Sequence, residues 1–180
     1  MKKKVCNMAL VVLSTIAVLF AFSAQAEDLK KESEQAVSNL LKADPSLSKF
    51  ISSAAGYAVF PSVGKGGFIV GGAHGKGLVY EKGKVIGQAS LTQASIGAQA
   101  GGQSFDEIIF FETSAALSDF KASKFEMSAD ISAVAAAEGA SKAAKYQKGV
   151  AVFTLPKKGL MVEAAVGGQK FKFEPICLSS

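Results

Sequence analysis

The chain has 180 residues, of which 49% are hydrophobic and 19% are charged, and its formal net charge is +5 at pH 7. This composition is typical of a globular domain with a proper core and excludes a disordered, highly charged chain. The chain contains no arginine, the residue that nucleic-acid binding proteins use most for phosphate and base contacts, which argues against nucleic acid as a partner.

The first 26 residues have the pattern of a secretory signal. A start rich in lysine is followed by an apolar run over residues 8–22 and by the cleavage pattern Ala24-Gln25-Ala26. We therefore expect a signal peptide over 1–26, a single mature domain over 27–180, and a periplasmic or secreted location. An uncleaved membrane anchor is the competing interpretation, but the apolar run is short for a full span. The mature domain holds 17 lysines against 15 acidic residues.

Two helices are predicted at the start of this domain. Over residues 28–42, apolar and small side chains recur on one stripe at helical spacing. Asp44-Pro45 is an N-cap followed by proline at the first helical position, and it predicts a short helix to about Ala55 with Gly56 as its stop. The first helix either lies on a membrane or covers a sheet, and the acids mixed with lysines on its polar face favour the sheet.

From Tyr57 onward the pattern changes to β-strands. Glycine is dense between residues 64 and 112, but its neighbours are apolar and β-branched, which indicates strands with close backbone approach. Glu81-Lys82-Gly83-Lys84 predicts a hairpin turn, residues 71–77 a second turn, and residues 138–142 a third. A helix is expected over 114–122, capped by Thr113 or Ser114. The predicted strands are 57–60, 67–73, 77–82, 84–100, 106–112, 124–137, 149–154, 159–166 and 169–174.

Catalytic and metal-binding chemistry finds little support. The mature domain has one histidine, His74, and one cysteine, Cys177, which together cannot supply the three or four ligands of a zinc site. The glycine-rich segments match neither the Walker A nor the dinucleotide-binding pattern. We expect His74 to lie in a solvated turn, and we predict no catalytic residues, no metal and no cofactor.

Lysines are the remaining candidates for function. Eight of them fall at predicted turns or strand ends: Lys65, Lys76, Lys82, Lys84, Lys157, Lys158, Lys170 and Lys172. Four of these eight are proposed to form a basic rim that meets phosphate head groups: Lys65, Lys76, Lys157 and Lys158. Lys30 and Lys31 lie at the start of the first helix and are candidates for the same role. The alternative is that turn lysines only keep the edges of the sheet soluble.

Several long strings resemble the SYLF domain, a family of lipid-binding modules. The strings are 64–72, 90–97, 101–112, 149–153, 158–164 and 167–171, and the resemblance extends over residues 29–175. In eukaryotic members it implies binding to phosphoinositide membranes, aided by an N-terminal amphipathic helix, and in some members binding to actin. The family's basic N-terminal segment is matched by residues 29–36, where Glu32 and Glu34 dilute the charge. In an export compartment the resemblance implies a different anionic lipid, such as phosphatidylglycerol or cardiolipin.

These observations lead to one expected fold and two functional alternatives. The fold is α+β: a twisted, largely antiparallel, barrel-like β-sheet with N-terminal helices and one inserted helix packed on it. The first function is non-catalytic binding of anionic phospholipid or membrane surfaces. The alternative is an interaction or structural module for a protein partner in the cell envelope, without lipid specificity. An enzyme is not expected, and the oligomeric state is left open.

Overall fold

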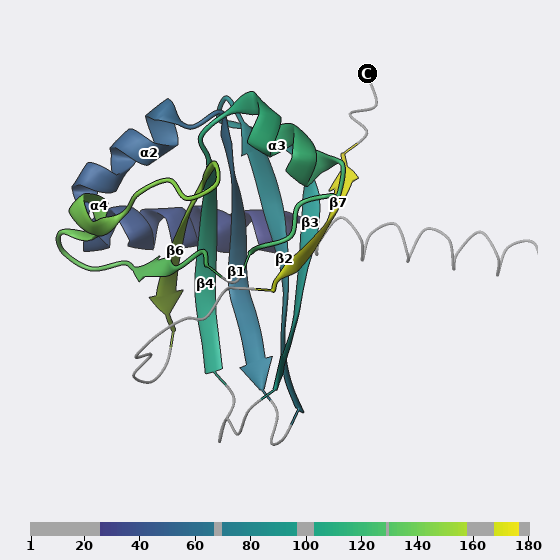
Figure 1. Ribbon diagram of the computed structural model, residues 1–180. Helices are drawn as coiled ribbons and strands as arrows, with labels where there is room; N and C mark the ends of the chain where they lie inside the picture. The colour runs from purple at the N-terminus through teal and green to yellow at the C-terminus, as the bar shows by residue number, and fades with distance from the viewer. Residues whose placement is uncertain (1–25, 67–69, 97–102, 129, 158–167, 177–180) are drawn as a thin grey trace, which may run out of the picture.

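The computed structural model describes residues 26–66, 70–96, 103–128, 130–157 and 168–176. A helix over residues 26–43 comes first. The elements that follow are the 3-10 helix η1 (Pro45–Leu47), α2 (Ser48–Ser53), β1 (Gly56–Gly66), β2 (Val70–Glu81), β3 (Lys84–Ile96), β4 (Gln103–Phe111), α3 (Ser114–Lys121), β5 (Ala133–Ala135), α4 (Ala140–Ala143), β6 (Val150–Pro156) and β7 (Lys170–Pro175). The fold is α+β, as predicted, and Figure 1 shows the strands as one sheet with helices on both sides.

The sheet has seven strands in the order β5-β6-β4-β1-β2-β3-β7. All neighbouring pairs are antiparallel except β5 and β6, which run parallel. β5 and β7 stand at opposite ends of this order, so the described strands form an open sheet. The largely antiparallel arrangement is therefore confirmed, while the barrel-like closure is not.

One face of the sheet, called the helix face, is covered by the N-terminal helix together with α2 and α4. The helix over 26–43 crosses the strands in Figure 1, and Ala36 and Leu40 are buried in the same cluster as Val59, Ile108 and Phe110. This packing confirms that the first helix covers the sheet, because its apolar stripe is used against the core. None of the helices in the described part of the chain has the length and hydropathy of a membrane-spanning helix.

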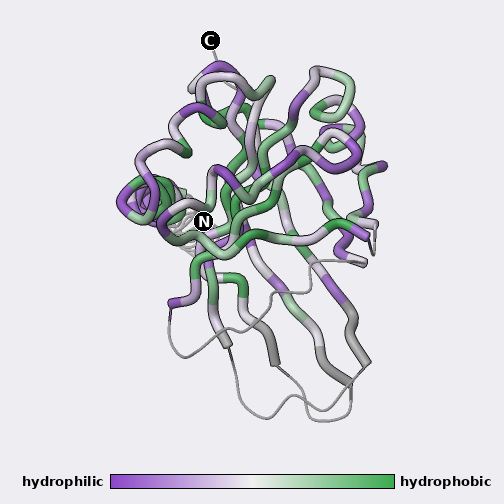
Figure 2. The backbone as a smooth tube through the Cα atoms, turned by 60° about the vertical axis from the view of Figure 1, so that its left-hand side comes forward, coloured by the Kyte–Doolittle hydropathy of each residue, from purple (hydrophilic) through white to green (hydrophobic). Residues whose placement is uncertain are grey.

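The opposite face, called the α3 face, packs against α3 and the segment that follows it. Leu117 and Phe120 of α3 are buried against Ile109 and Phe111 of β4. β7 also reaches this core, because the ring of Phe171 lies 5.2 Å from that of Phe120 between centroids. Figure 2 shows the hydrophobic segments of the sheet enclosed between these layers. The sheet is thus curled enough for its edge strand to cover its own centre.

Local sequence signals explain several boundaries. Thr113 caps α3 by accepting a hydrogen bond from the backbone N–H of Ala116, as predicted. The predicted hairpin turn joins β2 to β3, with Glu81 paired to Lys84. Its two central residues both have positive φ, 52° at Lys82 and 75° at Gly83, the combination of a type I′ turn, whose twist suits the flanking strands.

Other predicted boundaries were wrong. Residues 71–77 are not a turn but the middle of the continuous strand β2, and Gly56 is the first residue of β1, not a helix stop. Of the described residues in the strand predicted over 124–137, only Ala133–Ala135 form a strand, because Phe125, Met127 and Ile131 pack onto the α3 face from an irregular segment. The turn predicted over 138–142 includes the short helix α4. The strand predicted over 159–166 and the signal segment up to residue 25 lie outside the described residues.

Candidate functional site

The part of the helix face that the helices leave bare lies over β2, β3 and β7. Strand register fixes which side chains share it. Lys76 is opposite Ser90, and Ser90 is opposite Lys172. Two residues further along each strand, a second row on the same side consists of His74, Thr92 and Lys170. Because directly opposed residues point to one side of a sheet, three lysines gather on one surface, which we call the lysine face: Lys76, Lys170 and Lys172.

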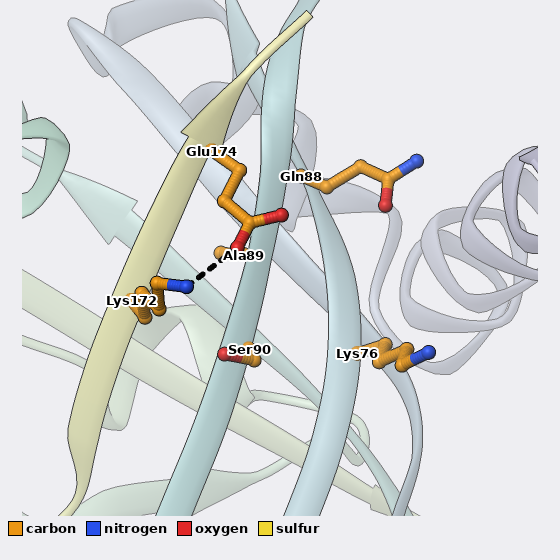
Figure 3. Close-up of a pocket in the computed structure, with 6 residues that line it drawn as sticks. All are labelled: Lys76, Gln88, Ala89, Ser90, Lys172 and Glu174. Carbon is orange, nitrogen blue, oxygen red and sulfur yellow. Dashed lines mark hydrogen bonds and ion pairs between the residues drawn. The ribbon is translucent and has the colours of Figure 1, made fainter.

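The lysine face contains a shallow hollow with a volume of about 320 Å³. Figure 3 shows the side chains of Lys76, Gln88, Ser90, Lys172 and Glu174 around it. Ala89 also lines the hollow, from the strand between Lys76 and Lys172. Lys76 and Lys172, with the hydroxyl of Ser90 between them, are suited to an anionic group that approaches from solvent and competes with Glu174.

The charges of this hollow interact with one another. The ammonium Nζ of Lys172 lies 2.8 Å from Oε1 of Glu174. That hydrogen bond raises the pKa of Lys172 and lowers the pKa of Glu174, and the charge of Lys76 adds to the lowering. Both partners of the pair are exposed, with 72% and 66% of their side-chain surface accessible. Exposed ion pairs are weak, so an anionic ligand could replace Glu174 as the partner of Lys172 at little cost in free energy.

Of the two rim lysines whose side chains the structure describes, Lys76 belongs to the lysine face and Lys157 does not. Lys157 lies at the end of β6, three strands from β2, or about 14 Å at the usual strand spacing. Its Nζ lies 3.1 Å from Oδ1 of Asp106 and also donates to the hydroxyl of Ser62. Asp106 is largely buried, with 5% of its side chain exposed, so Lys157 serves to neutralise a buried carboxylate. The side chain of Lys65 and all of Lys158 lie outside the described residues.

Lys30 and Lys31 are exposed on the N-terminal helix, and each has an acid one turn away, just as Lys170 of the lysine face has Glu126 at 3.9 Å. Lys30 lies 3.9 Å from Glu34, and Lys31 lies 3.4 Å from Glu27. The structure therefore does not bring the six predicted lysines together into one site.

The predicted rim did not include Lys170, Lys172 or Glu174, although both lysines were among the candidates at turns or strand ends. The signal was the alternation Lys170-Phe171-Lys172-Phe173-Glu174, which has the period of a strand with one buried and one solvated side. The alternation alone does not say which strand lies beside β7. The register shows that this neighbour is β3, which brings Lys170 and Lys172 close to Lys76. Within the described residues no three His, Cys, Asp or Glu side chains are grouped so as to hold a metal ion.

His74 lies on the lysine face, in the middle of a strand and not in a turn, and its side chain is exposed. We expect His74→Ala to change the free energy of unfolding by less than about 0.5 kcal/mol, because exposed side chains outside special contacts rarely contribute more. We also expect liposome binding to be almost unchanged, since the three lysines remain. Thermal melts and co-sedimentation measure the two effects, and a large loss in either would give His74 a specific role.

Comparisons with known proteins agree with the resemblance seen in the sequence. Residues 92–175 match the family Ysc84, described as Las17-binding protein actin regulator. The chain is also similar to beta cell expansion factor A of Aeromonas veronii, with 29% identity over 140 residues, which are 77% of this chain and 53% of that protein. The match thus spans only about half the length of that relative. The matched range contains β4, β6, β7 and the end of β3, so this part of the chain is similar to the SYLF (Ysc84) family.

Proposed function

We propose that this protein is a non-catalytic module that binds anionic phospholipid surfaces through the lysine face. The observation that carries the proposal is the row Lys76, Ser90 and Lys172, together with Lys170, on sheet surface that the helices leave bare. Each lysine held near an anionic membrane contributes on the order of 1 kcal/mol to binding. The similarity of residues 92–175 to the Ysc84 family supports a binding role, and the signal pattern in the sequence supports a periplasmic or secreted location.

The test is co-sedimentation with phosphatidylglycerol liposomes. The triple variant Lys76→Gln, Lys170→Gln, Lys172→Gln removes three positive charges from one surface and should weaken binding by at least about tenfold at low salt. Physiological salt should shrink the difference, because it screens exposed charges.

A matched variant separates position from net charge. Lys42, Lys142 and Lys145 are exposed and lie on the N-terminal helix or in and beside α4. Changing these three to Gln removes the same charge from elsewhere, and we expect a much smaller loss. Equal losses would mean that only net charge matters, and an unchanged affinity of the first variant would contradict the lysine face as the lipid site.

A second candidate function is protein binding, favoured by the family description as a binder of the protein Las17. The exposed pair of Lys172 and Glu174 carries both charges, as interfaces between proteins often do. This alternative predicts that the lysine-face variant loses a protein partner from the cell envelope while liposome binding stays unchanged. Cross-linking of the exported protein in cells, compared between the wild type and the variant, measures that loss.

A further inference from the structure

A carboxyl group is buried in the core on the α3 face. Glu107 lies on β4 between Phe105 and Ile109, and alternation along the strand turns it toward the same cluster as these two. Its cross-strand neighbours are Phe60 on β1 and Thr154 on β6. Its exposed fraction is 0%. A charged carboxylate in such surroundings is costly unless it is paired.

The partner of Glu107 is an amide, not a cation. Nε2 of Gln169 donates to Oε2 of Glu107 over 2.9 Å, and Gln169 is also fully buried. The second oxygen of each side chain, Oε1 of Glu107 and Oε1 of Gln169, has no hydrogen-bond partner among the described residues. Two acceptors left over on one hydrogen-bonded pair are unusual in a protein interior, where nearly all polar atoms are satisfied.

One proton on Glu107 would give both of these oxygen atoms a hydrogen-bond partner. A carboxylic acid and an amide can pair through two hydrogen bonds: the amide N–H donates to the carboxyl oxygen, and the acid O–H donates to the amide oxygen. A proton on Oε1 of Glu107 would therefore satisfy that atom and Oε1 of Gln169 together. An ionised Glu107 would leave both without a donor, and the penalty for each is substantial.

No described charge compensates an ionised Glu107. The other side chains packed on the α3 face, from β1, β6, α3 and residues 125–131, are apolar or, like Thr154, polar but uncharged. The nearest charged residues along the chain are engaged elsewhere. Asp106 pairs with Lys157 at 3.1 Å, and the exposed Glu126 and Lys170 lie 3.9 Å apart. Burial accordingly raises the pKa of Glu107 to about 7, and the hydrogen bond from Gln169 opposes this only in part.

The Glu107–Gln169 pair also joins distant parts of the fold. Gln169 stands just before β7, which is four places from β4 in the strand order. The backbone around it is tied to Met127, whose N–H donates to the carbonyl of Gln169 over 2.9 Å and whose carbonyl accepts from the N–H of Gly168 over 2.7 Å. The pair is thus a tie between the centre of the open sheet and the segment that covers it.

We propose that Glu107, as a neutral carboxylic acid paired to the Gln169 amide, is a proton-controlled latch that holds residues 168–169 and Met127 on the sheet. Loss of the proton to solvent breaks the acid–amide pair and favours detachment of this segment. The proposal is independent of the lysine face and of any ligand that the protein binds.

The test is hydrogen exchange of the Met127 and Gly168 amides between pH 5.5 and 8.5, corrected for intrinsic exchange. With a Glu107 pKa of 4.5 when open and about 7 when closed, the opening equilibrium should rise about thirtyfold over this range. In Glu107→Gln the pair becomes amide with amide, keeps two hydrogen bonds and has no proton to lose, so its exchange should not depend on pH. The amides of Val59 and Ile109 serve as internal controls in both proteins.

A second measurement needs no variant. The carboxyl carbon shift of Glu107 in the wild type, followed by NMR, should titrate well above the ordinary range of glutamate. A midpoint near 4.5 would overturn the proposal, whether or not Glu107→Gln folds. Equal pH dependence of Met127 and Gly168 exchange in the wild type and in Glu107→Gln would overturn it as well.

Discussion

Replacing Phe110 with alanine is expected to lower the free energy of unfolding by about 3–5 kcal/mol. Phe110 is fully buried on the helix face. Its ring centroid lies 5.7 Å from the rings of Phe50, Tyr57 and Phe153. These partners come from α2, β1 and β6, so no single element can move in to fill the cavity that the substitution leaves. The loss of stability should therefore lie at the high end of the range for buried aromatic residues.

Urea unfolding of the mature protein measures this difference. Ile176→Ala is the matched control, because Ile176 is also large and apolar but is 40% exposed, and we expect a change within about 0.5 kcal/mol. A loss of less than about 1 kcal/mol for Phe110→Ala would mean that the two layers of the helix face do not depend on this aromatic cluster.

Local patterns were enough to predict the helices at 26–43 and 114–121 and the β2–β3 hairpin. Each has a signal within a few residues: an apolar stripe, a Thr cap, or Lys82-Gly83 with both residues at positive φ. The segment 71–77 was predicted as a turn because its glycines resemble a loop. In the sheet they are needed where strands approach closely, so tertiary packing overrides the local preference.

The candidate site depends on strand register, and this is why the predicted rim included only one of its lysines, Lys76. Lys76 and Lys172 are 96 residues apart in the chain and become neighbours through Ser90 on the strand between them. The same limit applies to the Glu107–Gln169 pair, whose members look like ordinary surface residues until both are found fully buried. Lys157 is the opposite case: it was predicted to bind a ligand, but in the structure it pairs with the buried Asp106.

Replacing Gly77 with alanine is expected to destabilise the protein by at least about 2 kcal/mol, although only one methyl group is added. A Cβ at this position of β2 would lie 2.3 Å from the backbone oxygen of Val59 and 2.7 Å from the ring of Phe60. Val59 and Phe60 lie on the central strand β1 and are fully buried, so neither atom can withdraw without shifting the sheet. Gly77 is therefore required for close approach, and not for a positive φ.

Gly64→Ala provides the matched comparison. Gly64 is a strand glycine of the same β1–β2 pair, but a Cβ there would come no nearer than 4.0 Å to its closest neighbour, the carbonyl oxygen of His74. Since alanine also restricts the unfolded chain, this substitution should be neutral or stabilising by up to about 1 kcal/mol. Denaturant melts should thus show a lowered midpoint for Gly77→Ala and an unchanged or raised midpoint for Gly64→Ala. Similar midpoints would contradict the close contact of Gly77 with β1, because both variants add the same methyl group to the same strand pair.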